Sequence, residues 1–98
     1  MHLDIQLSPA HEPWEAVRDG VIVAEEAGYG TAWVFDHFAG AMLGGDRMLE
    51  CFTLLGALAA STARIGLGTL VANVANRHPA VLAHSAASVQ IVSGGRFV

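Results

Sequence analysis

Apolar and polar positions along the chain follow two alternating patterns. Short apolar stretches rich in β-branched and aromatic residues have the character of strands, and longer stretches between them carry helical signals. The strands expected from this pattern are residues 2–7, 31–36, 64–71 and 96–98. The expected helices begin at Pro13, at Asp46 or Met48, and at Pro79, and they end at Gly28, Ser61 and Gly94-Gly95. Residues 37–47 and 72–78 are expected to form loops.

Apolar residues at helical spacing define a buried face on each of the first two helices. The first face consists of Trp14, Val17, Val21 and Ala24, and the second of Leu49, Phe52, Leu55 and Ala59. Pro13 and Pro79 suit the first position of a helix, where no amide hydrogen is needed, and Gly28 suits a C-cap. Gly56 lies inside the second helix, where glycine costs about 1 kcal/mol relative to alanine. We therefore expect Gly56 to mark a close packing contact.

The order of these elements predicts the fold class. Strands and helices alternate strictly, and residues 31–36 are apolar along their whole length, as in a strand buried on both faces. This arrangement is typical of parallel βαβ units joined by right-handed crossovers. The chain ends within a fourth unit, so the expectation is an α/β fold in which residues 1–98 are the N-terminal part of a larger domain.

Composition narrows the class of protein further. Hydrophobic residues make up 53% of the 98 residues and charged residues only 14%, which predicts that a larger body or a partner covers much of the surface. The chain has no lysine, and all nine acidic residues lie in its first 50 positions, so the clustered basic residues of a nucleic-acid site are missing. No apolar run reaches the length of a membrane span, and no signal peptide precedes the first strand. The single cysteine, Cys51, favours a reduced, cytoplasmic location.

The acid and imidazole at Asp36 and His37 are the first candidate for chemistry. They follow an apolar strand directly, and ligands of parallel α/β proteins gather at the carboxyl ends of the strands. Histidine can transfer a proton near neutral pH, and an adjacent carboxylate can orient it or share its proton. The structural alternative is that Asp36 caps a helical turn in the following loop. Position alone leaves both readings open.

Other polar and glycine positions are weaker candidates. Gly66 and Gly68 supply only part of a dinucleotide fingerprint and lie within a strand, so we expect them to admit another backbone or a flat ring. His78 is expected to help start the third helix, and His84 to lie on its face with its hydrogen bonds satisfied. Cys51 is expected in the core. No set of residues has a metal-ligand spacing, so no metal is expected.

Three blocks of the sequence together resemble a known family. In chain order they are AEEAGYGTAWVFDHF, ECFTLLGALAASTARIGLGTLV and NRHPAVLAHSAASVQIVSGGRF. They resemble the luciferase-like monooxygenase superfamily, and most closely its coenzyme F420-dependent oxidoreductase branch. The resemblance extends from about Ala24 to Val98. It implies a (β/α)8 TIM barrel, of which this chain would supply three and a half β/α units without closing the barrel.

The resemblance also implies a function. The expected activity is hydride transfer between coenzyme F420, a deazaflavin, and a small organic substrate. The alternative is an FMN-dependent monooxygenase that uses reduced flavin and O2, with a flavin reductase as partner. A second alternative is a non-catalytic fragment or binding module, and the 98 residues by themselves are expected to be inactive. No nucleic-acid or membrane partner is expected, and a homodimer of the full-length protein is left open.

Roles for individual residues follow from the same resemblance. His37 would act as a base or stabilise charge during hydride transfer, and Asp36 would lie beside the reacting face of the ring as a catalytic and cofactor-binding residue. A non-proline cis peptide that forms a bulge against the ring maps onto Leu70 and Val71. Asn73 would contact the cofactor.

Ser8, at the end of the first strand, would line the substrate pocket. The residues that hold the cofactor's phosphate in this family come largely from later strands. The NRHP segment, with Asn76 and Arg77, is close to family usage but implies no particular substrate.

Overall fold

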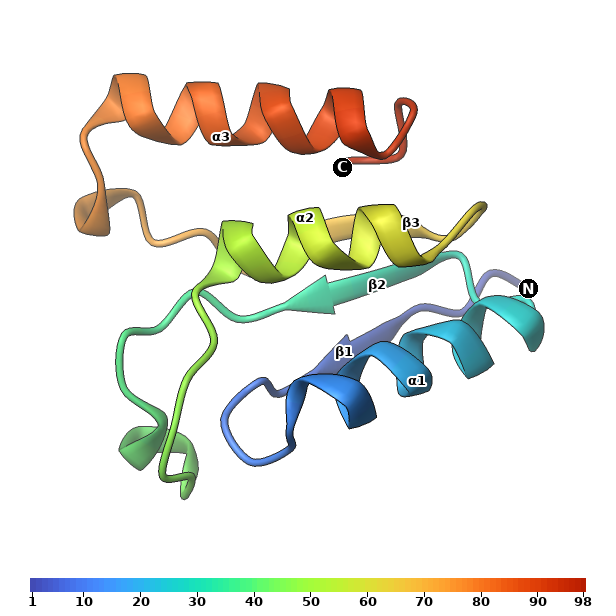
Figure 1. Ribbon diagram of the computed structural model, residues 1–98, viewed down its shortest axis with the longest axis horizontal. Coiled ribbons are helices and arrows are strands. Elements are labelled where there is room, and N and C mark those ends of the chain that lie inside the picture. The colour runs from blue at the N-terminus through green and yellow to red at the C-terminus, as the bar shows by residue number, and fades with distance from the viewer.

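The computed structural model describes residues 1–98 and has the predicted alternation of elements (Figure 1). The strands are β1 (Ile5–Leu7), β2 (Thr31–Val34) and β3 (Gly66–Thr69), and the α-helices are α1 (Trp14–Glu26), α2 (Cys51–Ser61) and α3 (Pro79–Val92). Both predicted loops contain a short 3-10 helix, η1 (Gly40–Leu43) and η2 (Val74–Asn76). The strands are shorter than predicted, because their apolar flanks continue into the connecting loops.

The sheet is parallel, as the alternation predicts. Its strand order is β1-β2-β3, and the register pairs Gln6 with Trp33 and Trp33 with Gly68. Phe97 forms an isolated parallel bridge to Leu67, so the last residues begin a fourth strand beside β3. The fold class is therefore α/β with an open sheet of parallel strands.

The three helices cover one face of this sheet, with α2 between α1 and α3 (Figure 1). The buried core lies between the helices and that face. It consists of Val17, Val21, Ala24, Ala32, Val34, Cys51, Phe52, Leu54, Leu55, Leu58, Ala59, Ile65, Leu67 and Val89. Since side chains alternate across a strand, Gln6, Trp33 and Gly68 form a row on the opposite face. Trp33 is only half-buried, so the expectation that β2 is buried on both faces is wrong for these 98 residues.

Helix ends explain two further differences from the predictions. Pro13 has extended backbone angles and is the N-cap of α1, one residue outside the helix. Helix α2 begins at Cys51 because the Glu50 carboxylate accepts the amide hydrogen of Thr53, which makes Glu50 its N-cap. At the end of α1, Gly28 follows the C-cap with a φ of 87°, a conformation that favours glycine.

The glycines inside elements behave differently from one another. A Cβ at Gly68 would lie 2.4 Å from the Trp33 ring, so this position admits a flat ring as expected. A Cβ at Gly56 would meet nothing within 4 Å, so the expected close packing contact at Gly56 is wrong. Separately, none of the helices combines the length and apolar character required to span a membrane.

Candidate functional site

The carboxyl ends of the three strands meet at one edge of the sheet, on the left in Figure 1. We call this the carboxyl edge. The segments that leave it are the turn after β1, the long loop after β2 that contains η1, and the loop after β3 that contains η2. Every site residue predicted from the sequence lies on one of these three segments, so the fold brings them to a single region.

Asp36 is held by two partners from the loop after β3. Its side chain is 1% exposed, and the Arg77 guanidinium binds it through two hydrogen bonds, from Nη1 to Oδ2 at 2.5 Å and from Nη2 to Oδ1 at 2.8 Å. The backbone amide of Asn73 also donates to Oδ2, at 2.8 Å. Asp36 therefore joins the end of β2 to two points in the loop that follows β3.

These partners keep Asp36 ionised. Burial raises the pKa of Asp36, but the hydrogen bonds from Arg77 and from the Asn73 amide outweigh burial, so the pKa lies below its ordinary value. At neutral pH the carboxylate is negative and has no proton to donate. This is the protonation state that suits a structural anchor.

Arg77 also binds a second carboxylate. Its Nη2 donates to Glu50 Oε1 at 2.6 Å, and its guanidinium lies 4.9 Å from the centroid of the Phe52 ring. Burial raises the pKa of Glu50, but hydrogen bonds from Thr53 and Arg77 lower it to about 2. Two carboxylates thus compensate one guanidinium whose side chain is only 10% exposed.

His37 follows Asp36 and differs from it in environment. It is half-buried, its ring lies 5.8 Å from the ring of Phe35, and neither ring nitrogen hydrogen-bonds to another residue. The imidazole nitrogens are therefore free to meet a ligand. Because Asp36 is anchored, the backbone that carries His37 starts from a fixed point.

Leu70 and Val71 form an apolar ledge at the carboxyl edge. The peptide bond between them is cis, as the resemblance implies, and their exposed fractions are 45% and 70%. The Leu70 amide donates to the Val34 carbonyl at 3.0 Å, and the Leu70 carbonyl accepts from Gln6 Nε2 at 3.0 Å. The ledge is thus fastened to both β2 and β1.

Ser8 and Asn73 complete the predicted set. The Ser8 hydroxyl is buried and has no hydrogen-bond partner among these residues. Most buried hydroxyl groups in proteins have such a partner, so Ser8 is an exception within this chain. The Asn73 side chain accepts the Ala75 amide at 3.1 Å and caps η2. Its side-chain oxygen is therefore already engaged within its own loop.

Sequence reasoning missed three residues of this region. Arg77 was noted only as part of the NRHP segment, and Glu50 and Gln6 were not singled out. Each left a signal: Arg77 is a charge in a charge-poor half of the chain, Glu50 directly precedes an apolar helix, and Gln6 is a polar residue between apolar strand positions. None of these signals identifies the residue that each side chain contacts in the folded protein.

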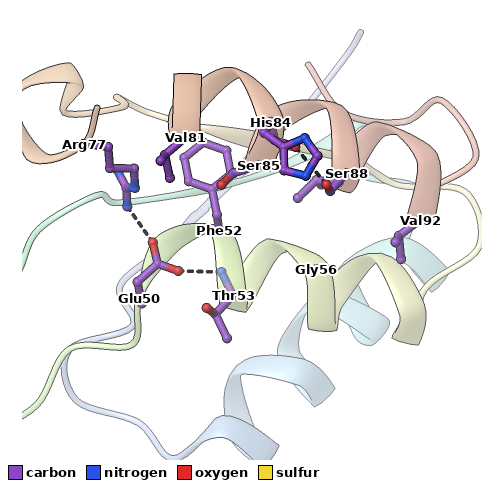
Figure 2. A pocket seen from close by; sticks show the side chains of 11 residues that line it. Glu50, Phe52, Thr53, Gly56, Arg77, Val81, His84, Ser85, Ser88 and Val92 are labelled. Atoms are coloured by element: carbon purple, nitrogen blue, oxygen red, sulfur yellow. Dashed lines mark hydrogen bonds and ion pairs between the residues drawn. The ribbon is translucent and has the colours of Figure 1, made fainter. Parts of the chain in front are cut away.

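The main hollow of the structure lies elsewhere, between α2 and α3. It is a groove of about 440 Å³ to which α2 contributes Thr53 and Gly56 and α3 contributes His84 and Val92 (Figure 2). His84 lies on an exposed face of α3, as expected for a helix-face residue, and its ring forms no hydrogen bond to another residue of the chain. The His78 ring, by contrast, accepts the Ala80 amide and starts α3 as predicted.

A second hollow, of about 290 Å³, lies beside Trp14 and Leu54. Neither hollow is lined by His37 or the ledge. No group of three or more histidine, cysteine, aspartate or glutamate side chains is placed to hold a metal ion.

Comparisons with known proteins agree with this architecture. The model of the luciferase-like monooxygenase family matches residues 1–98. The chain is 31% identical over 97 residues to the 5,10-methylenetetrahydromethanopterin reductase of Methanopyrus kandleri, which covers 96% of this chain and 24% of the relative. It is 33% identical over 76 residues to the enzyme of the same name from Methanolobus tindarius, covering 78% of this chain and 21% of the relative.

Solved structures of enzymes with similar sequences have the same fold over these residues. The coenzyme F420-dependent tetrahydromethanopterin reductase of Methanopyrus kandleri superposes with a TM-score of 0.84 at 28% identity, covering 99% of this chain and 25% of that one. Monooxygenase RslO1 from Streptomyces bottropensis superposes with a TM-score of 0.85 at 26% identity, covering 99% of this chain and 31% of that one.

The chain belongs to the luciferase-like monooxygenase family. Its open parallel sheet matches the N-terminal part of the TIM barrels of that family. The chain spans about a quarter of the length of the curated relatives it matches.

Proposed function

We propose that the protein is a coenzyme F420-dependent oxidoreductase that transfers hydride between the cofactor and a small organic substrate. The observation that carries this proposal is the pairing, at one edge of the sheet, of a histidine with free ring nitrogens and an exposed apolar ledge at Leu70 and Val71. The Methanopyrus kandleri relative, which its name describes as F420-dependent, supports the choice of cofactor.

The residues at the carboxyl edge fit a flat ring system. In the proposal, the apolar ledge packs against the ring of the cofactor. Asp36 and Asn73 hold together the loop that lies beside this ring. In the same proposal, Ser8, whose buried hydroxyl has no partner in this chain, would belong to the wall of the substrate pocket. Coenzyme F420, when bound, accepts or supplies two electrons as hydride. The chain itself contributes the apolar surface of Leu70 and Val71 and the free imidazole of His37.

His37 is the proposed proton-handling residue. An imidazole can accept or release a proton near neutral pH, and the two ring nitrogens of His37 have no competing partner in the chain. The ring can therefore take the proton that hydride transfer leaves on the substrate, or stabilise the charge that develops there.

Cofactor binding is the first prediction. We expect the full-length protein to bind coenzyme F420 in a fluorescence titration, and to bind it more tightly than FMN. Tighter binding of FMN would favour instead an FMN-dependent monooxygenase, the second candidate, which the similarity to monooxygenase RslO1 supports. Binding of neither cofactor would refute both candidates and favour a non-catalytic module.

The second prediction concerns His37. The first assay uses reduced F420 as the hydride donor and 5,10-methylenetetrahydromethanopterin, the compound in the names of two relatives, as the hydride acceptor. In this assay H37A should lower kcat by about 10²–10⁴-fold. The dissociation constant of F420 should change by less than about tenfold, since the ledge that packs against the ring is intact. H84A, which removes an exposed imidazole from the α2–α3 groove, is the matched control and should change neither quantity. Equal losses of kcat and affinity in H37A would show that His37 is structural.

A further inference from the structure

The Asp36 carboxylate connects the end of β2 to two points in the loop after β3, which is distant from it in the sequence. It terminates the extension of β2, binds the Asn73 amide just beyond the ledge, and pairs with Arg77 just before α3. Three of its acceptor positions are occupied, and its side chain is 1% exposed. This leaves little of Asp36 for contact with a substrate, and suggests a structural role for its charge.

Arg77 is itself fixed on a second side. Glu50 binds its Nη2, and Glu50 in turn accepts the Thr53 amide at the start of α2 (Figure 2). The Phe52 ring lies under the guanidinium. A planar guanidinium bound to two carboxylates at once has one orientation, so Arg77 links the start of α2 to the end of β2 without rotational freedom.

The ledge is held at both ends by this arrangement. Gln6 and Val34 bind the carbonyl and the amide of Leu70, and Asp36 binds the amide of Asn73. Between these points, Val71 is 70% exposed. The position of the Asn73 end therefore depends on Asp36, and the position of Asp36 depends on Arg77.

We propose that Arg77 is a positioning residue, which fixes the ledge and the backbone of His37 through Asp36 without contacting substrate or cofactor. Asp36 then has a positioning role as well, in place of the proton-sharing role that its place beside His37 suggests. The structural part of this proposal stands without the proposed function. Its effect on catalysis rests on that function.

The test separates the two parts. In the full-length protein without cofactor, hydrogen exchange of the Asn73 amide should be at least tenfold faster in R77M than in the wild type, because Asp36 loses its fixed orientation. The Leu67 amide, which donates to Arg96 in the sheet, is the internal reference and should change much less. R64M, which removes an exposed arginine whose side chain forms no hydrogen bond, is the matched control and should leave the Asn73 amide unchanged.

Catalysis gives a second readout. R77M should raise the dissociation constant of F420 and lower kcat at least tenfold, and R77K should recover part of both, because lysine keeps the charge but not the two-pronged geometry. The pH at which kcat is half-maximal should stay the same, since Arg77 acts on position. A shifted midpoint, or normal Asn73 exchange in folded R77M, would overturn the proposal.

R77M leaves the buried Asp36 charge without its partner, which is strongly destabilising and can prevent folding. A second variant keeps the proposal testable in that case. The double variant D36N/R77Q removes both charges, and the proposal predicts fast Asn73 exchange in it too; protection equal to wild type would overturn the proposal. If exchange is accelerated but the wild type binds neither F420 nor FMN, the positioning role holds and the proposed function fails.

Discussion

Single side chains in this fold take their chemical state from burial and from the charged groups that the fold places beside them. Cys51 shows this as clearly as Asp36 does. It is 1% exposed, and burial, followed by the charges of Asp36 and Glu50, raises the pKa of its thiol to about 12. A thiol in this state is protonated at neutral pH and is a poor nucleophile. The prediction from the sequence that Cys51 belongs to the core is confirmed.

The state of Cys51 leads to a direct chemical prediction. In the folded protein we expect iodoacetamide at pH 8 to leave Cys51 unmodified over a period in which a free thiol peptide reacts fully. After addition of denaturant, the same thiol should react at the rate of the peptide. Mass spectrometry of the Cys51 peptide measures both. Rapid alkylation under native conditions would show that the start of α2 opens readily.

Whole elements are fastened to each other by a few polar side chains at their ends. The Glu25 carboxylate of α1 accepts the backbone amides of Ala63, Arg64 and Ile65 before β3. The Arg96 guanidinium donates to backbone carbonyls in and after the last turn of α2, including those of Ala59 and Thr62. A cation at the C-terminal end of a helix also matches the helix dipole. These contacts orient the helices on the sheet.

Two glycines in neighbouring elements predict opposite effects of one substitution. G68A should lower the free energy of unfolding by about 1–3 kcal/mol, because its Cβ would overlap the Trp33 ring and the ring would have to shift away from its hydrogen bond to Asp4. G56A should raise it by up to about 1 kcal/mol, because the new methyl group meets open space and alanine favours the helix. Denaturant unfolding of both variants measures the difference.

The stability of G56A also tests whether another part of the protein packs against α2. If G56A destabilises the full-length protein, then something outside these 98 residues packs closely against α2 in the groove shown in Figure 2. The contrast between the two variants depends on their surroundings, since the chemical change is the same in both.

At the scale of the whole molecule, the stability of this fold is tied to ionised carboxylates. Burial raises the pKa values of Glu25, Asp36 and Glu50, but hydrogen bonds outweigh burial and leave all three pKa values below their ordinary values near 4.5, 3.8 and 4.5. In the unfolded chain these groups bind protons at higher pH than in the folded one. Their contribution to stability is therefore complete above about pH 5 and is lost as the pH falls towards about 2.

Acid unfolding tests this dependence. We expect the free energy of unfolding to decrease steadily below about pH 5, and the decrease to be shallower in E25Q, which has no proton to gain at that position. E12Q, which changes an exposed glutamate without hydrogen bonds, is the control and should follow the wild type. Identical pH slopes for E25Q and the wild type would show that Glu25 does not contribute.

The sequence by itself determined the alternation of strands and helices, the parallel sheet and most of the buried helix faces. These features depend on local periodicity and on turn residues such as Pro79 and Gly28, which act on their near neighbours in the chain. Sequence also placed Asp36, His37, Leu70 and Val71 at strand ends, and a resemblance spread over three blocks of residues indicated the family.

Only the tertiary structure decided what those residues contact. That Asp36 pairs with Arg77, that Gln6 holds the Leu70 carbonyl, and that Gly56 faces open space depend on segments brought together by the crossovers. Pairing across 41 residues leaves no periodic trace in the sequence, because either partner alone has the pattern of an ordinary polar loop residue. The physical reason is that charge and hydrogen-bond complementarity are properties of two positions in space.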